Sequence, residues 1–211
     1  MSVRVFLASR NPKKLVEMRR ILAEAMSEIG GTDVEVLGLD DVPAYDEPVE
    51  DQPTFEGNAL LKARAGLAAT GLPSVADDSG LCVDALGGMP GVLSARWSGR
   101  PKSDDRNNDL LLQQLSDVPD ERRGAHFASA VAFCAVSGSG EPVELVVEDR
   151  MDGRVIRETR GSGGFGYDVL FVADEFPDLT TAELEPADKD AISHRGRALR
   201  TIAPQIAAAL R

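Results

Sequence analysis

The 211-residue sequence has only two cysteines, few aromatic residues and no long hydrophobic run. Cys82 and Cys134 lie in apolar stretches without paired-cysteine spacing, which argues against a disulfide framework and a zinc site. The longest apolar run, residues 127–136, falls short of the ~20 residues that a membrane-spanning helix needs. The opening residues 1–8 are too quickly interrupted for a signal peptide. We therefore expect a cytoplasmic protein with no membrane partner.

Positive charge is also scarce, with 23 basic against 35 acidic residues and a net charge of −12. This balance argues against a nucleic-acid partner, because such binding needs an extended basic face. A small anionic substrate needs only a local cluster of donors and is compatible with the charge. The hydrophobic content of 43% and charged content of 27% are typical of a soluble globular protein.

Periodicity predicts helices and strands that alternate early and strands that run together later. Helices are predicted at residues 12–29, 54–71 (with Thr54 as N-cap), 104–115 and 193–210, the last kinked or broken at Pro204. Strands are predicted at residues 3–8, 34–37, 72–76, 125–136, 143–148, 153–156 and 169–172. This order predicts an α/β fold with a mixed sheet.

The stretch Asp77-Asp78-Ser79-Gly80 is the most informative in the chain. It follows an apolar run that reads as a buried strand, and Ser79 and Gly80 predict a sharp turn. Adjacent buried carboxylates are costly because they repel each other and lose hydration, and a divalent cation would remove both costs. The stretch therefore suggests phosphate chemistry or metal-assisted hydrolysis. An ordinary surface turn is the alternative.

Basic and amide side chains lie where the first strand gives way to the first helix, in Ser9-Arg10-Asn11-Pro12-Lys13-Lys14. Free N–H groups at a helix start favour an anion, so this segment could cradle a triphosphate. It is not a P-loop. An ordinary basic helix start is the alternative. Lys62 shares a helix face with Asn58 and could add phosphate contacts, or simply lie on a solvated face.

Two later stretches suggest recognition of a ring. Phe165-Gly166-Tyr167-Asp168 follows a glycine run, and an aromatic side chain there could stack on a nucleobase or merely anchor the loop. Lys189, His194 and Arg195 place donors near the start of the last helix, where an anion or a carbonyl-rich ligand would explain them.

Taken in order along nearly the whole chain, these stretches resemble the inosine/xanthosine triphosphate pyrophosphatase family. The matching segments are Ser9-x-Asn11-x-x-Lys14, Thr54-Phe55-x-x-Asn58-Ala59-x-x-Lys62-Ala63, Ala76-Asp77-Asp78-Ser79-Gly80-Leu81, Gly88-x-Pro90-Gly91 with Ser94-Ala95-Arg96, Gly163-Gly164-Phe165-Gly166-Tyr167-Asp168, and Lys189-x-x-Ile192-Ser193-His194-Arg195-Gly196.

The resemblance implies a two-lobed α/β fold with a long mixed central sheet and an active-site cleft between the lobes. It implies a single pyrophosphatase domain over residues 1–211, a homodimer and dependence on Mg²⁺. The implied reaction hydrolyses non-standard purine nucleoside triphosphates (ITP, dITP, XTP) to the monophosphate and pyrophosphate.

Site residues follow from the same resemblance. Asp78 is implied as the general base, and Asp78, Asp77 and Glu50 as metal ligands. The implied substrate-binding residues are Ser9, Arg10, Asn11, Pro12, Lys13, Lys14, Lys62, Ser79, Phe165, Gly166, Tyr167, Asp168, Lys189, His194 and Arg195.

Elementary geometry adds one expectation about the acidic pair. Adjacent residues of a strand point to opposite faces, so Asp77 and Asp78 should not do the same job. Two other functions fit the residues: a pyrophosphatase that prefers modified pyrimidine triphosphates, and a regulatory protein that binds the nucleotide without turnover.

Overall fold

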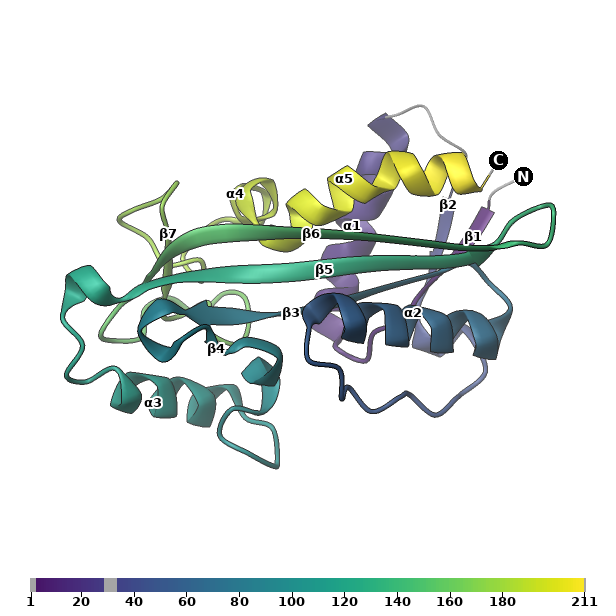
Figure 1. The fold of residues 1–211 in the computed structure, drawn as a ribbon. Helices are drawn as coiled ribbons and strands as arrows, with labels where there is room; N and C mark the ends of the chain where they lie inside the picture. The colour runs from purple at the N-terminus through teal and green to yellow at the C-terminus, as the bar shows by residue number, and fades with distance from the viewer. Residues whose placement is uncertain (1–2, 29–33, 211) are drawn as a thin grey trace. The chain divides into compact units, whose positions relative to one another are not determined.

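The computed structural model describes residues 3–28 and 34–210. They form two compact units. Figure 1 colours the chain from purple at its N-terminus to yellow at its C-terminus. The first unit takes its residues from 1–78, 129–149 and 195–211, and the second from 79–128 and 150–194. Strands β3, β5 and β6 each contribute residues to both units.

The α-helices and strands follow one another in a mixed order. The α-helices are α1 (Pro12–Glu28), α2 (Phe55–Thr70), α3 (Asp104–Gln114), α4 (Pro186–Ile192) and α5 (His194–Ala209). The strands are β1 (Val3–Leu7), β2 (Val34–Leu37), β3 (Ser74–Val83), β4 (Met89–Pro90), β5 (Gly124–Val136), β6 (Pro142–Val155) and β7 (Phe171–Ala173). Short 3₁₀ turns lie at Leu39–Asp41, Asp84–Leu86, Gly91–Arg96 and Asp120–Arg122.

The hydrogen-bonded strand order is β2-β1-β3-β5-β6-β7, with β4 paired to β3. Strand β1 runs parallel to β2 and β3, whereas β4 and β7 run antiparallel to their neighbours. Parallel neighbours require a crossover, which α1 and α2 supply. The predicted α/β fold with a mixed sheet is therefore confirmed.

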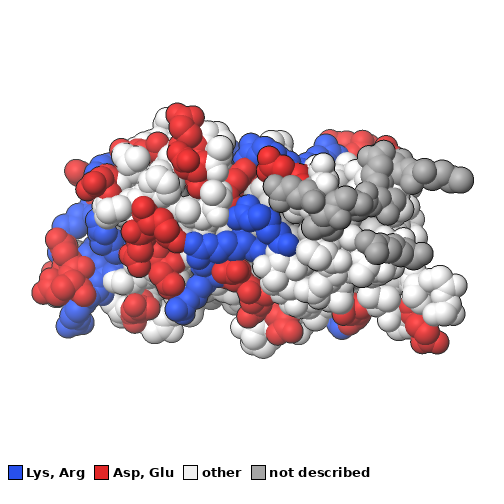
Figure 2. All heavy atoms as spheres, turned by 90° about the horizontal axis from the view of Figure 1, so that it is seen from above, with Lys and Arg blue, Asp and Glu red and all other residues white. Residues whose placement is uncertain are grey.

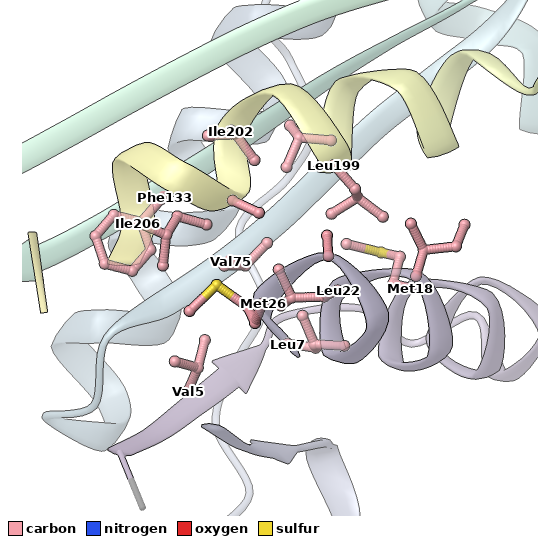
Figure 3. Close-up of a cluster of buried hydrophobic side chains, with 14 of the residues drawn as sticks. Val5, Leu7, Met18, Leu22, Met26, Val75, Phe133, Leu199, Ile202 and Ile206 are labelled. Atoms are coloured by element: carbon pink, nitrogen blue, oxygen red, sulfur yellow. The ribbon is translucent and has the colours of Figure 1, made fainter. Parts of the chain in front are cut away.

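Side-chain alternation along β1 and β3 sets the layers of the first unit. Val5, Leu7 and Val75 point to one face, and there they pack with buried residues of α1 and α5 (Figure 3). Phe6 and Ala76 point to the other face, where they pack with buried alanines of α2. The start of β3 thus has α1 and α5 on one side and α2 on the other, which decides where the acidic pair points.

The second unit has its own core. Its buried residues come from the end of β3, from α3, from the start of β5, from the end of β6 and from β7 with the turn before it. The principal members are Leu81, Val83, Leu111, Leu115, Phe127, Met151, Leu170 and Phe171. The phenyl rings of Phe127 and Phe171 meet edge to face at a centroid distance of 4.8 Å.

The caps of α2 are those that the sequence predicts. The Thr54 side chain accepts a hydrogen bond from the Gly57 N–H, and Gly71 ends the helix with φ of 69°. Of the kink or break predicted at Pro204, the break is wrong, because α5 continues past that residue, and the kink stays a prediction. The predicted end of the first helix at Ile29 lies outside the described residues.

The predicted turn at Ser79 and Gly80 is also wrong, because β3 runs without interruption from Ser74 to Val83. Gly80 is explained by close approach instead. A Cβ atom there would lie 2.3 Å from Ser94 Oγ and 2.4 Å from the Gly91 carbonyl oxygen, so no side chain fits. Residues 143–156, predicted as two strands, belong mostly to the single strand β6, and the short helix α4 was not predicted.

Both cysteines are free thiols in buried positions. Among residues 3–28 and 34–210, no helix is long and apolar enough to cross a membrane. On the face drawn in Figure 2, basic and acidic side chains are intermixed, so positive charge does not dominate that surface.

Candidate active site

The two adjacent carboxylates of β3 point to opposite faces of the sheet. Asp77 lies on the same side as Val75, toward α1 and α5, and Asp78 lies on the side of Ala76, toward α2. Their hydrogen-bond partners come from those helices accordingly. The opposite orientation of the two side chains, expected from strand geometry, is confirmed, and their separate roles stay a prediction.

Asp77 is fully buried and is held by two cations. Lys14 Nζ lies 3.2 Å from its Oδ2 and 3.3 Å from its Oδ1, and Arg195 Nε donates to Oδ2 at 3.0 Å. Arg195, whose side chain is 3% exposed, also donates through Nη1 to Glu17. Burial alone would raise the pKa of Asp77, but the charges of Lys14 and Arg195 hold it far below its usual value. Asp77 is therefore an ionised anchor for both cations.

Asp78 has fewer cationic partners than Asp77 that stabilise its negative charge. Its Oδ2 accepts from Asn58 Nδ2 at 3.1 Å and its Oδ1 from Lys62 Nζ at 3.3 Å. Burial raises the pKa of Asp78, and the charge of Lys62 offsets this only in part. A carboxylate with a raised pKa is a better base than an ordinary one.

Lys62 joins Asp78 to Glu50, whose Oε1 lies 2.8 Å from Lys62 Nζ. Burial would lower the pKa of Lys62, but the charges of the surrounding carboxylates raise it overall, so the ammonium is retained. Two carboxylates thus already share one cation at this point. Among the described residues, no three His, Cys, Asp or Glu side chains come together as a metal cage.

The donor set nevertheless fits Mg²⁺, since that ion commonly takes one or two carboxylates and completes its shell with water and phosphate oxygens. Glu50 and Asp78 supply such a pair. Asp77, the third sequence-predicted ligand, has both of its oxygens in contact with Lys14 or Arg195.

The segment at residues 9–14 begins α1. Asn11 Oδ1 accepts from the backbone N–H groups of Lys13 at 3.0 Å and Lys14 at 3.3 Å, and Pro12 opens the helix. Ser9 Oγ accepts from the Asn11 N–H at 3.4 Å. The segment therefore carries its own local cap, and Lys14 is the member that reaches the acidic pair.

Arg10 pairs outside the acidic cluster. Arg10 Nε lies 2.9 Å from a carboxylate oxygen of Glu47, and its side chain is 61% exposed. Lys13 is exposed as well.

Burial lowers the pKa of Lys14, and the charge of Asp77 opposes this shift.

In the second unit, Asp168 organises the predicted ring-binding segment. It accepts from the Phe165 N–H at 2.8 Å, from Lys189 Nζ at 2.7 Å and from Thr181 Oγ1 at 2.9 Å. Lys189 Nζ lies 5.4 Å from the centroid of the Phe165 ring. The structure thus brings Phe165, Asp168 and Lys189 together.

The other predicted residues of this unit differ in exposure. Tyr167 is buried, and its hydroxyl donates to the Ser94 carbonyl at 3.0 Å, so it anchors the loop. His194 is also buried, with its ring stacked on Phe127 at a centroid distance of 5.1 Å. Ser79 follows Asp78 in β3 and is half-buried.

Glu17 is a member of the Asp77 cluster that the sequence analysis missed. It follows Lys14 by three residues on α1, and this spacing places both side chains on one helix face. That spacing was the available signal. Nothing local in the sequence indicates that α5 supplies the cation between Glu17 and Asp77.

The chain is similar to known proteins over nearly its whole length. A model of the Ham1 family matches residues 5–205. A dITP/XTP pyrophosphatase of Nocardia farcinica is 60% identical over 205 residues, which cover 97% of this chain and 95% of the relative. A dITP/XTP pyrophosphatase of Mycobacterium tuberculosis is 57% identical over 203 residues, covering 96% and 95% of the two chains.

Solved structures are also similar to this chain in fold and sequence. A crystal structure of the Mycobacterium abscessus nucleoside-triphosphatase / dITP/XTP pyrophosphatase has 54% identity and a TM-score of 0.72, covering 96% of this chain and all of that one. A HAM1 protein of Coxiella burnetii has 34% identity and a TM-score of 0.79, with 98% and 100% coverage. The family model and these relatives, each matched over nearly the whole chain, show that the chain belongs to the Ham1 family.

The two carboxylates should contribute differently to stability. Replacing Asp77 with Asn leaves Arg195 and Lys14 buried without their shared anion, which should cost about 3–5 kcal/mol of unfolding free energy. Asp78→Asn is the matched control and should cost much less, because its charge is poorly supported. Urea denaturation in EDTA measures both values, and equal losses would contradict the assignment of Asp77 as the anchor.

Proposed function

We propose that this protein hydrolyses non-standard purine nucleoside triphosphates (ITP, dITP and XTP) to the nucleoside monophosphate and pyrophosphate, and so clears them from the nucleotide pool. The observation that carries the proposal is the pair of buried carboxylates on β3, one anchored by Lys14 and Arg195 and one left with a raised pKa. The names of relatives that are 57–60% identical support the substrate class. Both units serve one pyrophosphatase domain over residues 1–211.

We assign the triphosphate to residues 9–14, Lys62 and Ser79. Negative charge builds on the departing pyrophosphate as the α–β anhydride bond breaks, and fixed cations stabilise it. Lys14 is suited to this role because Asp77 holds its ammonium in place at 3.2 Å. Lys62 is held in the same way by Glu50 and Asp78.

We assign Asp78 as the general base that orients and deprotonates the water that attacks the α-phosphorus. In the protein without metal, burial raises the pKa of this carboxylate, which favours a role as a base. The Asn58 amide fixes one carboxylate oxygen at 3.1 Å and so sets the direction of the other.

Mg²⁺ is the metal that we propose, with Glu50 and Asp78 as its direct carboxylate ligands and Asp77 contributing nearby negative charge. When bound, the ion would neutralise phosphate charge and align the scissile anhydride. The Glu50–Lys62–Asp78 contacts support this, because they show that the two carboxylates accommodate one positive charge between them.

We assign the base to Phe165–Asp168, Lys189, His194 and Arg195. Hypoxanthine and xanthine carry a carbonyl at position 6, where adenine carries an amino group. Donors aimed at that carbonyl would lack a partner against adenine, a penalty of up to ~10⁴-fold in specificity. Lys189, held by Asp168 beside the Phe165 ring, supports this assignment.

We further propose a homodimer in the cytoplasm. The family resemblance motivates the dimer, and the two buried free thiols are what a reducing compartment maintains. Sedimentation equilibrium measures the first point directly.

A substrate panel tests the proposed reaction. With Mg²⁺, ITP, dITP and XTP should release pyrophosphate, and ATP, GTP and modified pyrimidine triphosphates should be much poorer substrates. EDTA should abolish turnover. Release of orthophosphate in place of pyrophosphate would contradict attack at the α-phosphorus.

Asp78→Asn tests the base. The variant keeps the side-chain volume but removes charge and basicity, so kcat should fall by about 10²-fold or more with the fold retained. Asp51→Asn, an exposed change of the same kind in the neighbouring loop, serves as the control and should be near wild type. Near-wild-type turnover of ITP by the Asp78 variant would exclude Asp78 as the base.

Arg195→Ala tests base reading. Its guanidinium is a donor only, so it favours a carbonyl at position 6 over an amino group. The ratio of kcat/KM for ITP over ATP should fall about 10-fold or more, because a charged hydrogen bond contributes ~1.5–3 kcal/mol. Equal losses for both substrates would instead assign Arg195, through Asp77, to the phosphate end.

A further inference from the structure

Two side chains of helix α3 hold the glycine-rich loop before Tyr167, through hydrogen bonds to the backbone N–H and carbonyl of Gly166. Asp104 Oδ2 accepts from the Gly166 N–H at 2.8 Å, and Asn108 Nδ2 donates to the Gly166 carbonyl at 3.0 Å. Asp104 and Asn108 are four residues apart, so both side chains project from one face of α3. The family resemblance assigned neither residue a role.

The loop needs such support because its backbone is unusual. Gly164 and Gly166 both have positive φ, at 69° and 62°. A Cβ atom on Gly164 would lie 2.1 Å from Asp168 Oδ2, so this backbone lies directly against the carboxylate that also holds Lys189. Phe165 therefore lies between two fixed points, Asp168 on one side and Gly166 on the other.

Helix stability does not explain Asp104. Ser103 already caps α3, since its side chain accepts from the Arg106 N–H, and Asp105 provides the same charge in the first turn. Asn108 is only 5% exposed, and its amide donates a hydrogen bond to a loop 58 residues away in sequence. The contacts of both side chains are thus explained by the loop and not by the helix.

We propose that Asp104 and Asn108 are positioning residues that fix the orientation of Phe165 for stacking on the purine, an inference that rests on the proposed function. Stacking depends on the angle and height of the ring, and a loop with two positive-φ glycines does not hold these by itself. Because every base presents a π face, the loss of this support should weaken all purine substrates alike.

Asp104→Ala should therefore raise KM for ITP about 5–10-fold and change kcat less than 2-fold, as expected when one charge-assisted hydrogen bond that orders a binding loop is removed. The ratio of kcat/KM for ITP over ATP should stay constant. Asp104→Asn keeps an acceptor oxygen and should recover most of the affinity. Asp105→Ala, the matched control, removes the same charge one residue along the helix and should leave KM unchanged.

A double-variant cycle shows whether the effect passes through the ring. In a Phe165→Ala background, Asp104→Ala should add little to KM, because the side chain that it positions is gone. Full additivity in that background, or an equal rise of KM in Asp105→Ala, would overturn the proposal.

Hydrogen–deuterium exchange separates this inference from the proposed function. If the wild-type protein releases no pyrophosphate from any triphosphate, the proposed function fails, and the hold of α3 on the loop is judged by exchange alone. Amides of residues 161–168 should then exchange faster in Asp104→Ala than in Asp105→Ala. Unchanged exchange in both variants would overturn the positioning role.

Discussion

Two carboxylates that are neighbours in sequence and buried in one strand face a single constraint: the strand must point them to opposite sides. In β3, Asp77 faces α1 and α5 and Asp78 faces α2. A buried anion requires a cation, so each helix layer has to provide one. Lys14 and Arg195 serve Asp77, and Lys62 serves Asp78.

Under the proposed function, the same constraint explains how an acidic protein would accept a polyanion. The net charge is −12, yet Lys14 and Lys62 are held in place by carboxylates, which would preorganise them for phosphate. The partners also differ in strength. Asp77 has two strong ones and its pKa falls, whereas Asp78 has one cation and an amide and its pKa rises. In the proposed mechanism the first anchors cations and the second takes a proton.

Local patterns predicted what depends on local structure. Thr54 and Gly71 bound α2 as its caps, as the sequence predicts. Glu17 was missed, although its spacing from Lys14 on α1 is a local pattern that could have indicated it. The turn predicted at Gly80 was wrong, because the glycine is required there by the close approach of Ser94. That contact joins residues that are distant in sequence. The hydrogen bonds from α3 to Gly166 could not be predicted from local sequence patterns either, because they join residues about 60 apart in sequence. Family resemblance predicted the class of site without these contacts.

The central claim is that water directed by Asp78 attacks the α-phosphorus, and the fate of solvent oxygen tests it most directly. Hydrolysis of ITP in H₂¹⁸O, followed by mass spectrometry of both products, should place one ¹⁸O atom in the inosine monophosphate and none in the pyrophosphate. Label in the pyrophosphate would show attack at the β-phosphorus and would contradict the account.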